Sequence, residues 1–123
     1  MSNFWDDAEI ISTYTREQAI EDGMLIDVST VAAECGFRFP VALTADAWAE
    51  GVALRKGYRG CQSEDGRLWD VLWMCFCQIR RSRGGDTIAF RVKVSNRWKF
   101  FKAVCGPGDN AEPVITIMTP NED

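Results

Sequence analysis

The chain has 123 residues with 18 acidic residues, 14 basic residues and no histidine, and 46% of its residues are hydrophobic. This length fits one domain over residues 1–123, and the apolar content argues against an intrinsically disordered protein. The lack of histidine excludes the Ser-His-Asp triad, the Cys-His dyad and the commonest catalytic zinc sites.

The first expected element is a helix that begins after Thr15, because Thr15 and Gln18 have the spacing of a capping box. Gly23 is placed to end it in the left-handed conformation. Residues 24–28 are then expected to form a strand or an extended segment. Ser29 is expected to cap a second short helix that ends at Gly36.

Residues 37–40 alternate in polarity, and Pro40 limits them to an edge or an extended connection. Thr44 is expected to cap a third helix. Residues 56–66 hold three glycines and no clear period, which predicts a loop.

The clearest helix is expected over residues 67–82, where one apolar stripe follows the helical period. The stripe consists of Leu68, Leu72, Cys75, Phe76 and Ile79. Trp69 and Trp73 flank it at i and i+4, a spacing that favours core packing over a ligand platform.

From Asp86 the period changes to two, which predicts a half-buried strand whose core face carries Ile88, Phe90, Val92 and Val94. A three-residue turn, Ser95-Asn96-Arg97, would set Trp98 opposite Val94 and Phe100 opposite Val92. The alternative two-residue turn would set Arg97 and Lys99 against the same valines. We therefore prefer the three-residue register.

Residues 113–119 are rich in β-branched side chains and are expected to form a third strand, after a turn at Gly106-Pro107-Gly108-Asp109. The expected fold class is α+β, with a helical N-terminal part packed on a C-terminal three-stranded antiparallel β-meander. An unpaired edge of that meander would allow a homodimer.

The charges are strongly segregated along the chain. Residues 1–79 carry a net charge of −7, residues 80–102 carry +7, and residues 103–123 carry −4. In the preferred register the hairpin presents a basic surface with one aromatic residue, which consists of Arg91, Lys93, Arg97, Lys99 and Phe101. Like charges paired across strands are destabilising unless something acidic covers them.

Two interpretations remain open for what covers this basic hairpin. The first is the protein's own acidic N-terminal surface, which consists of Asp6, Asp7, Glu9, Glu17, Glu21 and Asp22. The second is a nucleic-acid backbone or an acidic partner, since basic residues beside an exposed aromatic on a sheet face are one form of single-strand binding surface. The acidic surface could also compete for a nucleic-acid site on another protein.

Few sequence motifs in this chain indicate a catalytic or nucleotide-binding site. The Walker loop, the dinucleotide-binding glycine motif and the nucleophile elbow are all lacking. Adjacent carboxylates, Asp6 with Asp7 and Glu64 with Asp65, leave a small enzyme of unknown reaction as an alternative. The expectation is a non-enzymatic protein without a cofactor or a bound metal.

The five cysteines are odd in number and irregularly spaced, which is typical of reduced thiols. Cys61 near Arg59 would be the best candidate for a reactive thiol, although a general base is lacking. No uncharged apolar run approaches the roughly 18 residues that a membrane span needs. We expect a cytoplasmic protein that does not contact a membrane.

Several stretches resemble a family of small uncharacterised proteins carried on bacterial plasmids, phages and other mobile elements. They are residues 14–28, 36–44, 66–74, 102–109 and 112–118. The resemblance implies no catalytic residue. The genetic setting that it implies suggests a protein that binds and blocks a host defence complex such as a CRISPR effector, in the manner of an anti-CRISPR inhibitor. The alternative is a single-stranded nucleic-acid-binding module that uses the basic hairpin.

Overall fold

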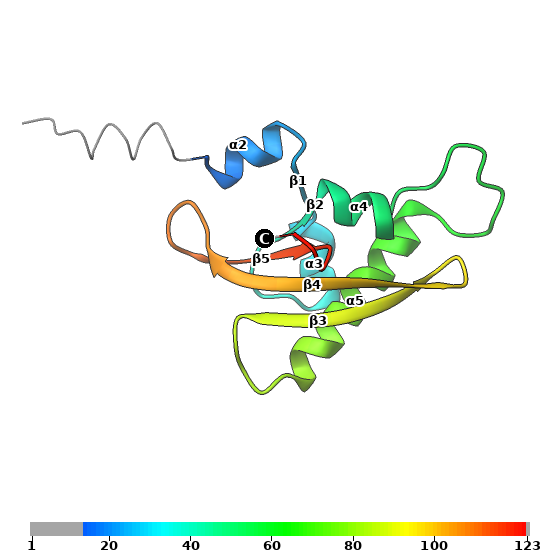
Figure 1. Ribbon diagram of the computed structural model, residues 1–123. Helices are drawn as coiled ribbons and strands as arrows, with labels where there is room; N and C mark the ends of the chain where they lie inside the picture. Colours follow the sequence, from blue (N-terminus) through cyan, green and yellow to red (C-terminus); the bar gives the residue numbers. More distant parts are fainter. Residues whose placement is uncertain (1–13, 123) are drawn as a thin grey trace, which may run out of the picture.

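The computed structural model describes residues 14–122 as an α+β fold built on one five-stranded mixed sheet (Figure 1). The helices are α2 (Arg16–Glu21), α3 (Ser29–Cys35), α4 (Ala45–Gly51) and α5 (Glu64–Arg81). The strands are β1 (Leu25–Asp27), β2 (Val41–Thr44), β3 (Thr87–Val94), β4 (Arg97–Pro107) and β5 (Pro113–Met118). Of the helices in residues 14–122, none is both long and apolar enough to cross a bilayer.

The predicted three-stranded antiparallel meander is wrong as a description of the sheet. β3, β4 and β5 do form an antiparallel meander, but β5 also pairs in parallel with β2, and β2 pairs antiparallel with β1. The strand order is therefore β1-β2-β5-β4-β3. The described helices lie mostly in the middle of the chain, so they do not form a separate N-terminal part.

The strand that the sequence analysis missed is β2. Val41, Ala42 and Leu43 are each at most 1% exposed, so both faces of this strand are buried. A strand buried on both faces shows no alternation of polar and apolar residues. Its parallel partner lies 74 positions further along, with Val41 opposite Ile115, a pairing that no local pattern indicates.

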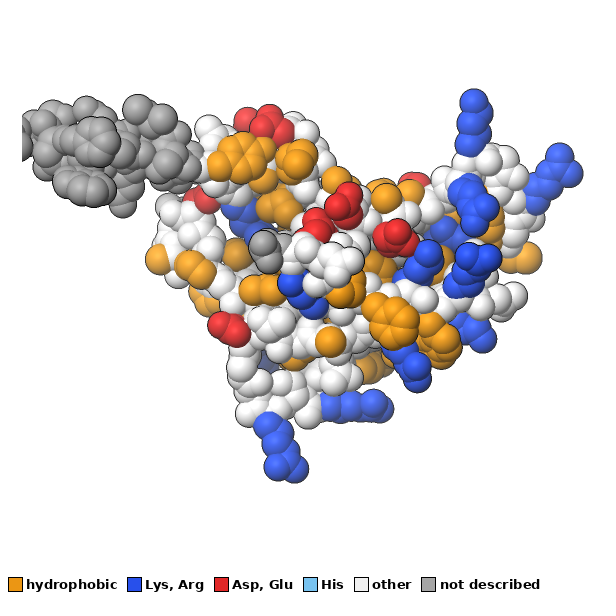
Figure 2. All heavy atoms as spheres, in the orientation of Figure 1, with side chains coloured by type: hydrophobic (Ala, Val, Ile, Leu, Met, Phe, Trp, Pro, Cys, Tyr) orange, Lys and Arg blue, Asp and Glu red, His pale blue; other side chains and the backbone are white. Residues whose placement is uncertain are grey.

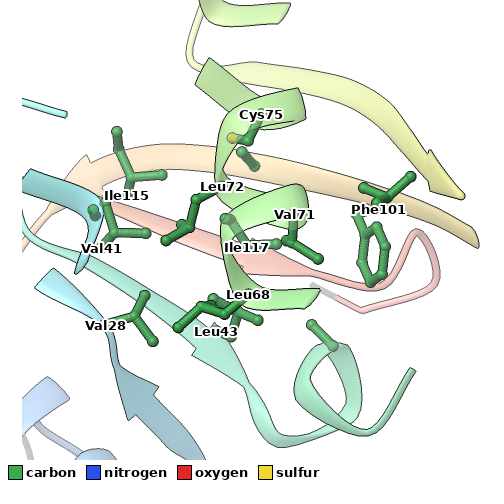
Figure 3. Close-up of a cluster of buried hydrophobic side chains, with 14 of the residues drawn as sticks. Val28, Val41, Leu43, Leu68, Val71, Leu72, Cys75, Phe101, Ile115 and Ile117 are labelled. Carbon is green, nitrogen blue, oxygen red and sulfur yellow. The ribbon is translucent and has the colours of Figure 1, made fainter. Parts of the chain in front are cut away.

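The main core lies between one face of the sheet and helices α3, α4 and α5 (Figure 3). The predicted stripe of α5 supplies Leu68, Leu72 and Cys75, which are at most 5% exposed. The sheet contributes alternate residues from its strands, including Phe101 and Ile117. The prediction for this helix is thus confirmed, although Trp69 and Trp73 lie outside the core and are 39% and 50% exposed.

Helix α2 lies at the opposite face, against β1. The guanidinium of Arg16 donates to Thr116 Oγ1 at 2.8 Å, and Thr116 alternates with the core residues Ile115 and Ile117. Asp109, in the β4–β5 turn, accepts hydrogen bonds from the backbone N–H groups of Arg16 and Glu17. These contacts hold α2 against the β1 and β5 side of that face, whereas Arg91, Lys93 and Phe100 of β3 and β4 are exposed among residues 14–122.

Helix boundaries follow the local signals closely. Thr15 and Gln18 form the predicted capping box, and Gly23 has the expected positive φ of 77°. Thr44 accepts a hydrogen bond from the N–H of Ala47 and caps α4 as predicted. Ser29 is not a cap, because it is the first residue of α3 and its hydroxyl donates to Asp27 at 2.6 Å.

The predicted register of the β3–β4 hairpin is wrong. Ser95 and Asn96 have φ values of 51° and 65° and form a two-residue turn, with Val94 paired to Arg97. Two positive φ values characterise the type I′ turn, whose twist matches that of the strands. Phe101 therefore faces Phe90 in the core, with ring centroids 5.6 Å apart.

Candidate nucleic-acid interface

The two-residue turn decides which side chains of the hairpin face solvent. Arg91 of β3 lies opposite Phe100 of β4, and Lys93 lies opposite Trp98. Both pairs alternate with buried residues of the core face, so they share the outer face of the sheet. Lys102 continues the row opposite Ala89. We call these five residues, Arg91, Lys93, Trp98, Phe100 and Lys102, the outer platform.

Two aromatic rings of the outer platform are open to solvent. Phe100 is 59% exposed and Trp98 is 46% exposed. The guanidinium of Arg91 lies over the Trp98 ring, 4.2 Å from its centroid. This cation–π contact orders the two side chains with respect to each other. The outer platform is thus a partly preorganised surface of stacked aromatic and planar cationic groups.

The hairpin as a whole is cationic. The segment from Thr87 to Pro107 contains five basic residues and no acidic residue. Figure 2 shows Lys and Arg side chains gathered at the side of the molecule where the β3–β4 turn and the loop after α4 lie in Figure 1, next to exposed hydrophobic side chains. A surface of this kind attracts polyanions over a distance set by the ionic strength.

The structure separates the residues of the predicted basic hairpin. Arg91 and Lys93 lie on the outer face as expected, but Phe101 is 1% exposed and belongs to the core. Lys99 lies opposite Val92 rather than Lys93, and its Nζ contacts Glu50 Oε2 of α4 at 2.9 Å. Arg97 is exposed at the end of the hairpin.

The acidic surface is described only in part. Asp6, Asp7 and Glu9 lie outside the described residues. Glu17, Glu21 and Asp22 are exposed on or just after α2, and Asp22 accepts a 2.6 Å hydrogen bond from the Tyr14 hydroxyl. Within residues 14–122, Lys99 with Glu50 is the one ion pair, so the described part of the acidic surface does not pair with the hairpin.

The cysteines form no metal-binding group among residues 14–122. No three Cys, Asp or Glu side chains of this part of the chain group closely enough to hold a metal ion. Burial, with a smaller effect of Cys35, raises the pKa of the Cys75 thiol to about 12, and burial also raises that of Cys35. Cys61 is an exposed free thiol.

Sequence reasoning missed the two aromatic residues of the outer platform. Trp98 and Phe100 were expected on the core face, because the three-residue turn shifts every residue of β4 to the other side. The sequence did hold one indication of the true register. Asn96 tolerates a positive φ, as the second position of a type I′ turn requires.

Comparison with known proteins places the chain in a family without assigning it an activity. Searches among curated proteins and among solved structures each found no significant match. The model of DUF6573, a family of unknown function, matches residues 1–123. The chain therefore belongs to the DUF6573 family.

Proposed function

We propose that this protein is a non-enzymatic module that binds single-stranded nucleic acid on the outer platform. One observation carries the proposal: Trp98 and Phe100 are exposed side by side on a sheet face whose neighbouring side chains are Arg91, Lys93 and Lys102. Sheet faces that bind single strands use aromatic rings in this way to stack bases, and basic side chains to contact the backbone.

The aromatic and the basic residues would make separable contributions. Stacking of one base on one ring is worth about 1–3 kcal/mol, so two rings would supply about 2–6 kcal/mol. Each basic residue that contacts a phosphate adds about −0.7 to the slope of log affinity against log salt for a single strand. Three such contacts, by Arg91, Lys93 and Lys102, would give a slope of about −2.

The test is fluorescence anisotropy with a labelled single-stranded oligonucleotide of 15 thymidines. The double variant Trp98→Ser with Phe100→Ser should weaken binding by at least about thirtyfold, which corresponds to the lower bound of about 2 kcal/mol. The matched control is Trp69→Ser with Trp73→Ser, which removes two aromatic side chains of similar exposure from α5. This control should bind like the parent protein.

Binding with no salt dependence, or equal loss in both double variants, would remove the proposal. A duplex of the same length provides a further comparison. Bases in a duplex are stacked on each other and are not free to stack on protein rings, so the duplex should bind more weakly than the single strand.

A protein of a bacterial mobile element that blocks a host defence complex, such as a CRISPR effector, is a second candidate. The observation that favours it is a group of carboxylates around one hollow at α2 and the β4–β5 turn, which consists of Glu17, Glu21, Asp27, Asp109 and Glu112. Surface carboxylates present negative charge as phosphates do, so this group could occupy a nucleic-acid site of a partner protein.

Charge reversal distinguishes this candidate from the first. Glu17→Lys with Glu21→Lys should abolish capture of a purified effector complex while leaving oligonucleotide binding intact. The two substitutions are at exposed positions of α2, and neither side chain is part of its capping box. Capture that persists in this variant would refute the acidic-surface version.

A further inference from the structure

A second basic feature lies beside the outer platform and is a cavity rather than a face. It has a volume of about 480 Å³ and lies between the loop after α4 and the β3–β4 turn. Its basic lining residues are Arg55, Lys56, Arg67, Arg97 and Lys99. Among residues 14–122, the single acidic residue of its lining is Glu50, which is paired with Lys99.

Arg67 is the unusual member of this lining, because its side chain is charged and only 6% exposed. Its Nε donates to Gln62 Oε1 at 2.9 Å, its Nη1 to the carbonyl of Ala53 at 2.9 Å, and its Nη2 to Ser95 Oγ at 2.7 Å. The Tyr58 ring lies 5.0 Å from the guanidinium carbon.

These contacts fix the position of the guanidinium but do not neutralise it. All three acceptors are uncharged, and within residues 14–122 no carboxylate lies within 4.0 Å of Arg67. A guanidinium carries five N–H donors, of which three are used here, so one on Nη1 and one on Nη2 remain. A buried charge is ordinarily paired with a charge of opposite sign.

An oxyanion would complete this arrangement. Two N–H groups on the two terminal nitrogens of one guanidinium match two oxygens of a phosphate group. Arg97, Arg55 and Lys56 are exposed at the same cavity and would supply further positive charge. The volume lies in the range of about 300–1,000 Å³ that is usual for ligand clefts.

We propose that this cavity is a binding site for a phosphate group, with Arg67 as its fixed donor and Arg97 and Lys56 as its outer donors. The proposal deepens the proposed function and rests on it for the source of the phosphate. Arg97 lines the cavity, and its neighbour Trp98 belongs to the outer platform on the other face of β4, so a strand that contacts both would have to pass around the end of the hairpin.

The experiment is isothermal titration calorimetry of the full chain with inorganic phosphate at a constant ionic strength set with chloride. The parent protein should show one saturable site. Arg97→Ser with Lys56→Ser should weaken phosphate binding by about tenfold or more, since each substitution removes a charged donor. The matched control, Arg81→Ser with Arg83→Ser, removes two exposed bases outside the cavity and should bind phosphate like the parent.

Arg67→Gln tests the buried donor directly, and its folding is checked by thermal unfolding. It should lose saturable phosphate binding. Should this variant fail to fold, the Arg97 and Lys56 double variant still decides the question, because both side chains are exposed. Absence of saturable phosphate binding in the parent, or equal binding in the cavity and control variants, would overturn the proposal.

Two further titrations identify the source of the phosphate. If it belongs to a strand, inorganic phosphate should compete with the 15-thymidine oligonucleotide, and the cavity variant should weaken oligonucleotide binding. If it belongs to a free nucleotide, thymidine monophosphate should bind the cavity while oligonucleotide binding is unchanged in the cavity variant. Either result supports a phosphate site. Phosphate binding that survives in the Trp98 and Phe100 variant, together with no oligonucleotide binding by the parent, would refute the proposed function alone.

Discussion

Phe100 and Phe101 are consecutive in β4, but the register of the hairpin gives them opposite environments. Phe101 is 1% exposed, whereas Phe100 is 59% exposed. Replacing each in turn by alanine therefore measures the register directly. The three-residue turn that the sequence favoured would reverse the two environments, so it predicts the opposite result.

The expected cost of Phe101→Ala follows from its contacts. The ring packs against Phe90, and its Cζ atom lies close enough to Gly51 that a Cβ there would be only 2.8 Å away. Truncation of a buried phenylalanine costs about 3–5 kcal/mol because of the lost transfer free energy and the cavity that remains. Phe100→Ala removes an exposed ring that lies opposite Arg91, and a cross-strand pair of this kind is worth about 0.2–1 kcal/mol.

Urea unfolding, followed by circular dichroism, measures both free energies of unfolding. At about 4 °C per kcal/mol for a domain of this size, Phe101→Ala should also lower the melting temperature by about 12–20 °C. Phe100→Ala should lower it by less than about 4 °C. A larger loss in Phe100→Ala than in Phe101→Ala would refute the two-residue turn and, with it, the outer platform.

Three other predictions concern stability. Gly51→Ala should destabilise the protein by about 1–3 kcal/mol in urea unfolding. The added Cβ would lie 2.8 Å from Phe101 Cζ and 3.1 Å from Val71 Cγ2. An unchanged unfolding midpoint would contradict this packing. Asp109→Ala should lower the free energy of unfolding by about 0.5–2 kcal/mol, because Asp109 accepts hydrogen bonds from the backbone N–H groups of Arg16 and Glu17. It should also speed hydrogen exchange at these two amides. Unchanged exchange at both amides would show that Asp109 does not hold α2. The Cys75 thiol has its pKa raised to about 12 by burial, from an ordinary value of 9.0, so the proton is lost more readily in the unfolded state. Stability should therefore fall as pH rises from 9 towards 12, and more steeply in the parent than in Cys75→Ala; parallel pH profiles of the two proteins in urea unfolding would contradict it.

The local part of this fold could be predicted from the sequence, because its signals are short in range. The capping box at Thr15 and the cap at Thr44 satisfy N–H groups of their own helices. The stripe of α5 follows the helical period because one side of that helix packs on the sheet. The strand pattern from Ile88 to Val94 is likewise a local consequence of one buried face.

The sheet could not be predicted because its order depends on contacts between distant residues. β2 is buried on both faces and therefore has no alternating pattern, and its parallel partner β5 follows after α4, α5, β3 and β4. A meander was the simplest arrangement of the strands that did show a pattern.

The predicted register of the hairpin was wrong for a different physical reason. The three-residue turn is favoured by the sequence because it keeps charged residues off the core face opposite Val92. Lys99 occupies that position near the end of the sheet, where its amino group reaches Glu50 of α4 and its side chain stays 35% exposed. The choice of turn decides the candidate site as well, because it moves both exposed aromatic residues onto the basic face.

The role of Arg67 in the basic cavity could not be predicted from the sequence. Arg67 is one basic residue in the first turns of a helix, and its sequence neighbours do not distinguish it from the exposed arginines near it. Its burial results from contacts with Ala53 and Ser95, which lie in two other parts of the chain. The cavity exists only after these parts come together.

Photo-crosslinking tests the central claim most directly. A single-stranded oligonucleotide that contains 5-bromouridine is irradiated with the full chain, and the crosslinked peptides are identified by mass spectrometry. The outer platform predicts crosslinks at Trp98 and Phe100, which disappear when unlabelled single strand is added in excess. Crosslinks confined to Trp69 and Trp73 of α5, or none that unlabelled strand removes, would contradict the account.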